Sequence, residues 1–351
     1  MTASLRLFRA IPVVLASFLF LSGSVRPVEP LVSTFSIVGF DPETGDLGIA
    51  VQSKFPNVRP IVPWAKAGVG AVATQSFAEL DYGIKGLKLM ENGANAEEAL
   101  RILMRGDADF QERQVGMVDA HGNAASWTGT GTFPWAGGRV GIEEGGSMTG
   151  AAGTLITGVG FAAQGNILVS AETVEALAET FVSTSGPLAD RLVAALAAGG
   201  RAGGDQRGEQ SAALLVVREG AGYDGMDNFI DISVYDHQTP IAELERLYRL
   251  NNLYFTQSEP EDMVMVTPEI ASELQSIWKE RGFYEGPVDG RADPEFQQIL
   301  VDYMGWENYD LRIAPVQKAD VAGGEPLYID REVLEDIRYV FREGLWKPRV
   351  N

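Results

Sequence analysis

Two short apolar segments decide the fold of this chain, Thr34–Phe40 (TFSIVGF) and Leu47–Ser53 (LGIAVQS). Asp41–Asp46 (DPETGD) joins them and contains the proline, glycine and acidic residues that tight turns require. Both segments are rich in apolar and β-branched residues and are bounded by turn signals, a pattern typical of strands. The sequence therefore predicts two strands joined by a turn, the first beginning at Thr34 and the second ending at Ser53.

The same patterns extend along the chain. Further strands are predicted over residues 69–75, 114–120, 124–128, 212–217 and 229–235. Helical spacing of apolar residues predicts two helical blocks, over 82–105 and 172–198, each interrupted by glycine-containing breaks. Strand hairpins around two helical blocks favour an α+β domain with helices on the outer faces of antiparallel sheets, a layered sandwich.

Composition excludes several classes of function. The 351 residues include 28 Lys and Arg against 48 Asp and Glu, a net charge of −20, which argues against a nucleic-acid partner. A hydrophobic content of 45% excludes wholesale disorder. With no cysteine there is no disulfide, thiolate nucleophile or cysteine-ligated metal, and only two histidines remain for a metal site or a triad. We predict neither a metal nor a cofactor.

The first 33 residues have the layout of a leader. Arg6 and Arg9 precede an apolar run, Ile11–Leu21, which is short for a membrane span and is followed by the small residues Ser22–Ser24. This predicts a secretory signal peptide and an exported protein, periplasmic or extracellular. The alternative is a single N-terminal membrane anchor.

A hydroxyl nucleophile needs a base, and this chain offers few histidines. A threonine at a newly made N-terminus supplies its own base, because its α-amine can accept the hydroxyl proton. Thr34, at the start of the first strand, is the candidate nucleophile. Ser53 and Gln75 each end a predicted strand and are candidates to stabilise an oxyanion. The alternative is that Thr34 is an ordinary β-branched strand residue.

Several motifs then occur in a fixed order along 34–247. They are TFSIV (34–38), LGIAVQS (47–53), VPWA (62–65), AGVGAVATQ (67–75), QGN (164–166) and AGGDQRGEQSAA (202–213). With these motifs the chain resembles a bacterial and archaeal family of unknown function placed in the N-terminal-nucleophile (Ntn) hydrolase superfamily. The resemblance implies a four-layer αββα sandwich over 34–250. It also implies attack by the threonine hydroxyl on an amide carbonyl, giving an acyl-enzyme that water hydrolyses.

The chain departs from this family in two respects. In related members the threonine follows the initiator methionine, whereas here it lies behind the leader, so cleavage between Ser33 and Thr34 must expose it. Cleavage after Ser24 would leave nine residues in front of Thr34 and block the mechanism. The family pattern also has a cysteine and a histidine around its second tryptophan, where this chain has Thr132 and Gly138.

The loop Gly203–Gly208 (GGDQRG) is the predicted substrate contact. Its glycines permit close backbone approach, Asp205 could hold a substrate ammonium, and Arg207 could hold a carboxylate. Gln210 begins the next strand and Asn166 ends the QGN motif; both are further candidates. The alternative for the loop is a flexible hairpin in which Asp205 and Arg207 pair in solvent. The alternative for Asn166 is that it is an ordinary turn residue.

The C-terminal segment, 260–351, predicts a small all-α module. Helices are predicted over 263–281, 294–304 and 332–343, the last with Asp330 as N-cap. The turn Gly286–Gly290 (GPVDG) after the first of these resembles the small helical peptidoglycan-binding modules, which implies peptidoglycan as a partner. The alternative is a helical appendage that packs on the first domain or mediates self-association.

Three hypotheses follow. The first is an exported Ntn amidohydrolase that acts on a small amide or peptide-like substrate, such as a cell-wall fragment. The second is a non-catalytic cell-wall or ligand-binding protein that retains the fold, and the third is a wall-associated structural protein. The substrate and the oligomeric state, including a homo-oligomer, stay open.

Overall fold

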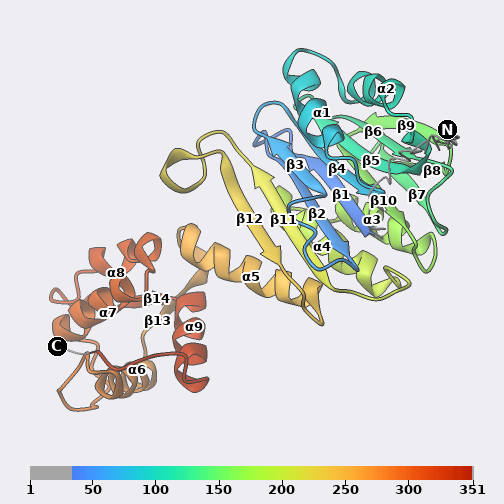
Figure 1. Ribbon diagram of the computed structural model, residues 1–351. Helices are drawn as coiled ribbons and strands as arrows, with labels where there is room; N and C mark the ends of the chain where they lie inside the picture. Colours follow the sequence, from blue (N-terminus) through green and yellow to red (C-terminus); the bar gives the residue numbers. More distant parts are fainter. Residues whose placement is uncertain (1–33, 350–351) are drawn as a thin grey trace, which may run out of the picture. The chain divides into compact units, whose positions relative to one another are not determined.

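A computed structural model describes residues 34–349, and the predicted leader lies outside this range. One sheet has the strand order β12-β11-β2-β1-β10-β7-β8, and every pairing in it is antiparallel (Figure 1). Its strands are β1 (Thr34–Phe40), β2 (Leu47–Ser53), β7 (Gly137–Gly141), β8 (Ser147–Ala151), β10 (Phe161–Asn166), β11 (Ser211–Val217) and β12 (Asn228–Val234). The predicted pair of strands at 34–53 therefore lies at the centre of this sheet.

The second sheet is also antiparallel, in the order β3-β4-β5-β6-β9. Its strands are β3 (Pro63–Lys66), β4 (Gly70–Ser76), β5 (Arg113–Asp119), β6 (Asn123–Thr128) and β9 (Thr154–Val159). Val38 and Ile49 of the first sheet share a buried apolar cluster with Ala71 and Val118 of the second. The two sheets therefore face each other across a common interior layer.

Helices cover the outer faces of both sheets. The helices are α1 (Asp81–Glu91), α2 (Ala96–Gly106), α3 (Glu172–Ser183), α4 (Leu188–Arg201) and α5 (Pro240–Phe255). Residues of α3, α4 and α5 form one core with Phe35 and Ile37 of β1, whereas α1 and α2 form another with Val72 and Met117 of the second sheet. Alternate residues of each strand thus point to the helices or to the opposite sheet, and the predicted α+β class with antiparallel sheets is confirmed.

The segment between Trp135 and the end of the QGN motif differs from the prediction. No strand was predicted over 137–166, yet it contains β7, β8, β9 and β10. Glycine and small residues are frequent in β7, β8 and β10 and weaken the strand pattern there, whereas β9 (TLITGV) is rich in β-branched residues. Each of these strands is held by antiparallel pairing with a neighbouring strand, as β10 is with β1.

The C-terminal region is helical, as predicted, with a short two-stranded ribbon in addition. It contains α6 (Pro268–Arg281), α7 (Pro294–Trp306), α8 (Ala314–Lys318), α9 (Arg331–Arg342), β13 (Met263–Met265) and β14 (Tyr328–Asp330), the last two paired. The helix predicted over 263–281 is present as α6, but it begins later than predicted, at Pro268. Pro268 occupies the first turn, where it lacks only a hydrogen bond that helix starts do not make, and the Thr267 side chain accepts from the Ile270 N–H.

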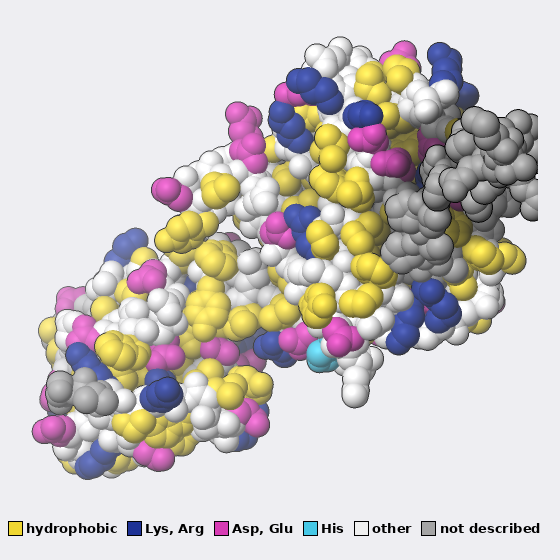
Figure 2. Space-filling view, viewed as in Figure 1, with side chains coloured by type: hydrophobic (Ala, Val, Ile, Leu, Met, Phe, Trp, Pro, Cys, Tyr) yellow, Lys and Arg dark blue, Asp and Glu magenta, His cyan; other side chains and the backbone are white. Residues whose placement is uncertain are grey.

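Short 3-10 turns complete the chain at Phe110–Glu112, Tyr223–Gly225, Pro260–Asp262 and Asp310–Arg312. Across 34–349, no helix is long and apolar enough to cross a membrane. On the face drawn in Figure 2, basic and acidic side chains are scattered among hydrophobic ones.

Candidate active site at the polar end of the inter-sheet layer

Thr34 lies at one end of the inter-sheet layer, at the start of β1. In the register of the sheet, its neighbours are Ser53 of β2 and Asn166 of β10. Thr34 and Val38 lie on the same face of β1, and Val38 faces the second sheet. The antiparallel pairing therefore brings together three candidate residues that lie far apart in the sequence, and all three are fully buried.

Hydrogen bonds hold Thr34 on both its side chain and its main chain. The Thr34 Oγ1 hydroxyl donates to Ser53 Oγ at 3.0 Å. The Thr34 carbonyl oxygen accepts from Gln75 Nε2 at 3.1 Å and from Asn166 Nδ2 at 3.5 Å. Gln75 belongs to the opposite sheet, so its amide crosses the interior layer to reach β1. The predicted residues Thr34, Ser53, Gln75 and Asn166 thus form one cluster.

Gln114 of β5 is the centre of this cluster, and the sequence prediction did not include it. Its Oε1 accepts from Gln75 Nε2 and from Asn166 Nδ2, each at 2.9 Å. Its Nε2 donates to Thr128 Oγ1 at 2.9 Å and to the Gly165 carbonyl at 2.8 Å. The alternation of side chains along β5 could have indicated it, because Gln114 lies on the same strand face as Gly116 and Val118, and Val118 packs between the sheets.

A second set of bonds continues the network deeper between the sheets. The Ser36 hydroxyl donates to Gln75 Oε1 and accepts from Gln164 Nε2, each at 2.7 Å. Gly116 opposes Gln164 so closely that a Cβ at this glycine would lie 2.1 Å from Gln164 Oε1. Every side chain named in this network is a neutral hydroxyl or amide. A buried network of this kind aligns the two sheets because each polar group finds a partner.

The predicted substrate loop lies beside this cluster. Asp205 Oδ2 accepts from the main-chain N–H of Lys54, the residue after Ser53, at 3.2 Å. Asp205 also accepts from the Arg207 N–H at 2.8 Å and forms an ion pair with the Arg207 guanidinium at 3.3 Å. The two side chains do pair, but the Asp205 side chain is 0% exposed and that of Arg207 34%. The loop is therefore an anchored structure, unlike the solvated hairpin of the alternative.

Gln210 turns its side chain away from the cluster. Its Nε2 donates to Asp236 Oδ1 at 2.8 Å, in an exposed contact, whereas its main-chain N–H donates to the Ser53 carbonyl. Glu209 lies next to it, and its main-chain oxygen accepts from Lys54 Nζ. Burial raises the pKa of the Glu209 carboxyl. The backbone of this segment thus borders the site, while the Gln210 amide does not enter it.

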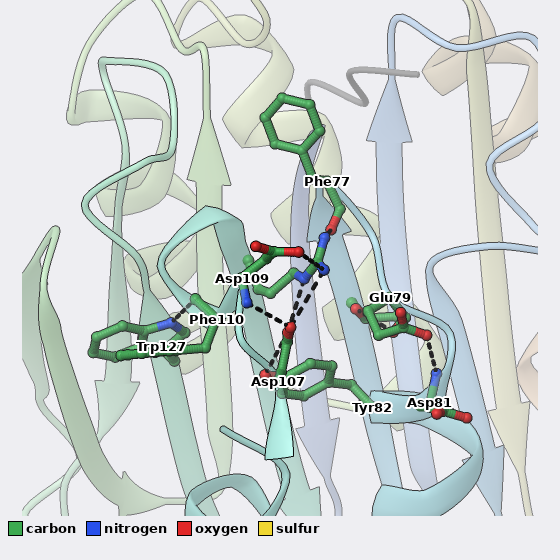
Figure 3. Close-up of polar contacts among 10 residues, drawn as sticks. Phe77, Glu79, Asp81, Tyr82, Asp107, Asp109, Phe110 and Trp127 are labelled. Carbon is green, nitrogen blue, oxygen red and sulfur yellow. Dashed lines mark hydrogen bonds and ion pairs between the residues drawn. The ribbon is translucent and has the colours of Figure 1, made fainter. Parts of the chain in front are cut away.

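The ion pair between Arg113 and Asp107 fixes the loop that follows β4. Arg113 Nη1 donates to the Phe77 carbonyl at 2.6 Å, and Arg113 Nε donates to Asp107 Oδ2 at 2.9 Å. The Tyr82 hydroxyl donates to the same carboxylate at 3.2 Å, as Figure 3 shows. Burial alone would raise the pKa of Asp107, but the hydrogen bonds from Arg113 and from the Asp109 main chain outweigh it and lower that pKa. Burial and the Asp107 charge raise the pKa of Tyr82.

The loops beyond the strand ends carry an aromatic pair. The rings of Phe77 and Phe133 lie 6.3 Å apart, and Phe133 is 46% exposed. The Phe133 carbonyl accepts from the N–H of Ile167, directly after Asn166. Among the described residues, no group of three or more acidic or histidine side chains is placed to hold a metal ion. The arrangement therefore offers hydroxyl, amide and main-chain chemistry at one buried threonine.

Comparisons with known proteins agree with this description. Residues 34–244 match the model of the "Family of unknown function (DUF1028)", and residues 254–335 match that of the "Putative peptidoglycan binding domain". The crystal structure of a DUF1028 protein from Silicibacter pomeroyi is similar, with a TM-score of 0.53 and 28% identity over 63% of this chain and 86% of that one. A search of curated proteins gives no match. This chain belongs to the DUF1028 family and carries a C-terminal peptidoglycan-binding-like domain.

Proposed function

We propose that this protein is an exported Ntn-type amide hydrolase with Thr34 as its nucleophile. The observation that carries the proposal is the position of Thr34 at the start of β1, where its hydroxyl donates to Ser53 and its carbonyl accepts from Gln75 of the opposite sheet. Helices on the outer faces of two facing sheets are the arrangement that the Ntn resemblance implies. The threonine is thus held rigidly at the point where a new N-terminus would begin.

In this proposal the free α-amine of Thr34 is the base. It accepts the hydroxyl proton as Oγ1 attacks the carbonyl carbon of an amide, and the proton then passes to the leaving amine as the C–N bond breaks. The product is an ester between Thr34 and the acyl group. Water attacks this ester, the ester C–O bond breaks, and the threonine hydroxyl is restored as the acid leaves. The neutral network around Thr34 supports this assignment, since none of its named side chains is a base at neutral pH.

We assign different roles to the surrounding candidates. Both hydrogens of the Gln75 amide are engaged, by the Thr34 carbonyl and by Gln114. Gln75 therefore positions Thr34, as does Asn166, rather than meeting an oxyanion. The Ser53 hydroxyl, 3.0 Å from Oγ1, is the group that can donate to developing negative charge. Arg207, with a third of its side chain exposed, is the group that can meet a substrate carboxylate, and Asp205 holds it in place.

The substrate in this proposal is a small amide or peptide-like compound from the cell wall. Residues 254–335 support this, because a peptidoglycan-binding-like domain on the same chain would hold the hydrolase near wall fragments. The predicted signal peptide supports an extracytoplasmic location. Phe77 and Phe133 add an apolar surface on loops next to the strand ends, suited to an acyl chain or an apolar side chain of the substrate.

The decisive experiment compares three preparations of defined N-terminus. One begins at Thr34, one at Val25, and one is the Thr34→Ala variant beginning at position 34; each is screened with amides, N-acyl amino acids and muropeptides. We expect turnover only from the first, and a rate that rises with pH through about 7.7–8.0, because only the neutral α-amine accepts the proton. Equal turnover by the Thr34→Ala variant would refute the assignment.

The same preparations separate the hydrolase from a binding protein that keeps the fold. N-terminal sequencing of the protein secreted by its host determines whether Thr34 is exposed. A mature terminus at Val25, together with undiminished ligand binding by the Thr34→Ala variant, would favour the non-catalytic alternative.

A further inference from the structure

A cavity of about 790 Å³ lies along the last turns of α5, apart from the cluster around Thr34. Its second wall is the end of the turn between β11 and β12 together with the start of β12, over residues 221–231. Its third wall is the segment 308–311, which follows α7. Sites that hold small ligands in proteins have volumes of about 300–1,000 Å³, so this cavity is large enough for one.

The second and third walls are both attached to α5. Leu244 of α5 shares a buried core with Ile232 of β12, and the two elements lie side by side in Figure 1. Near the other end of α5, Arg312 donates from Nε to the Leu253 carbonyl at 2.9 Å and from Nη2 to the Asn252 carbonyl at 3.0 Å. Arg312 directly follows the segment 308–311, so these bonds hold that segment on the helix. The cavity is therefore a fixed feature of the fold.

Each wall presents an accessible apolar side chain. Tyr223, Phe255 and Leu311 line the cavity from the three walls, and they are 81%, 53% and 45% exposed. Tyr254 adds a further ring, which is held by stacking on Tyr309 with centroids 5.5 Å apart. Large apolar groups that surround a cavity and stay exposed mark a surface that a ligand covers.

The polar groups of the cavity suit a neutral ligand. Asn251 and Asn308 line it, and within 34–349 neither side-chain amide has a hydrogen-bond partner. Asp231 and Asp310 also line it, and Asp231 is paired with Arg59 at 2.6 Å. The described lining contains no lysine or arginine. An anionic ligand would therefore meet carboxylates without a cation, whereas hydroxyl and amide groups would find free amide donors and acceptors.

We propose that this cavity binds the neutral glycan of the cell wall. The apolar faces of N-acetylated sugar rings lie on Tyr223 and Phe255, and their hydroxyl and N-acetyl groups bond to Asn251 and Asn308. This inference rests on the proposed peptidoglycan partner and names the part of it that is recognised. Tyr223 lies outside the matched residues 254–335, so the hydrolase-like domain shares in holding the glycan.

The test uses the full chain, insoluble peptidoglycan and a soluble oligomer of β-1,4-linked N-acetylglucosamine. We expect the oligomer to compete with the wall for the protein, and stem peptides freed of sugar to have no effect. Tyr223→Ala should weaken binding to both the wall and the oligomer by about tenfold, the loss typical of an aromatic contact at the centre of a site. Asn251→Ala should weaken both by about fivefold, because one hydrogen bond to the ligand is lost.

Tyr235→Ala is the matched control, because it removes an exposed tyrosine just beyond β12 and outside the cavity. It should bind like the wild type. Wall binding that survives both Tyr223→Ala and Asn251→Ala would overturn the cavity while leaving the peptidoglycan partner, and competition by the stem peptides alone would overturn the glycan assignment. Absence of wall binding by the wild-type chain would overturn both the cavity and the partner. Binding requires no free α-amine at Thr34, so a failure of the hydrolase chemistry is measured separately.

Discussion

The hydroxyl of Thr34 donates to that of Ser53 at 3.0 Å, across two central strands whose register places these residues directly opposite each other. Both side chains are fully buried. The turn at 41–46 folds β2 against β1 and so places the Ser53 hydroxyl beside the candidate nucleophile. This pair therefore gives the most direct test of the proposed chemistry.

Ser53→Ala should lower turnover without unfolding the protein. In a preparation that begins at Thr34, we expect kcat to fall by about 100-fold, because the hydroxyl proposed to stabilise the oxyanion is lost. The free energy of unfolding should fall by only about 1 kcal/mol, the net value of one hydrogen bond. Steady-state kinetics and urea denaturation check the two values. An unchanged kcat would remove Ser53 from the catalytic group.

Gln114 and Gln52 form a matched pair of buried glutamines with opposite expectations. Gln114 bonds to Gln75, Asn166 and Thr128, so Gln114→Met should lower the free energy of unfolding by about 2–3 kcal/mol because it leaves buried donors unpaired. Within 34–349, neither polar atom of Gln52 has a partner. Gln52→Met should therefore be neutral or stabilising.

Urea denaturation of both variants checks this comparison. Gln114→Met should also reduce kcat, since Gln75 loses an acceptor that orients it toward Thr34, whereas Gln52→Met should leave kcat close to that of the wild type. Equal destabilisation by the two substitutions would contradict the importance assigned to the inter-sheet network.

Asp107→Asn should destabilise the first domain in a pH-dependent manner. At about pH 7 we expect a loss of about 2–3 kcal/mol, because Arg113 keeps its buried guanidinium but loses a charged acceptor. The pKa of Asp107 is lowered in the folded protein, so its contribution is complete above the unfolded value of about 3.9. It is lost as the pH falls through the folded value.

Denaturation of wild type and Asp107→Asn at about pH 7 and about pH 3 measures this difference, which should shrink in acid. Arg101→Gln, on an exposed ion pair of α2, is a control expected to change stability by less than about 0.5 kcal/mol. A difference between wild type and Asp107→Asn that stays constant with pH would argue against the ionised pair.

Asp330 combines two functions that substitution can separate. One carboxylate oxygen accepts from the N–H groups of Glu332 and Val333 at the start of α9, and the other accepts from Arg312 Nη1 at 2.6 Å. Both Asp330 and Arg312 are buried. Asp330→Asn keeps a good N-cap but breaks the ion pair, which should cost about 3 kcal/mol. Asp330→Ala should cost about 1 kcal/mol more.

Hydrogen exchange of the α9 peptide, followed together with denaturation, checks this order. Loss of protection should be greater in Asp330→Ala than in Asp330→Asn. Equal stability of the wild type and Asp330→Asn would show that the cap, and not the ion pair, stabilises this helix.

Much of the fold could be predicted because local patterns express it. The strands 34–40 and 47–53 are bounded by strong turn chemistry, and the two helical blocks keep their apolar periodicity. Glycine and small residues carry little strand preference, which explains why β7, β8 and β10 were not predicted; the β-branched β9 (TLITGV) did carry a strand pattern in the sequence. The helix predicted over 263–281 begins later than predicted because Thr267 and Pro268 set its start, a signal visible in the sequence.

For the candidate site, the sequence alone determined which chemistry was available: no cysteine, few histidines, and a threonine at the head of a central strand. Only the tertiary structure decided what surrounds that threonine. Gln114 lies far from Thr34 along the chain, and only the facing of two separate sheets brings its amide to Gln75 and Asn166. Residue preferences are local, whereas such contacts depend on register and on sheet packing, which no short stretch of sequence contains.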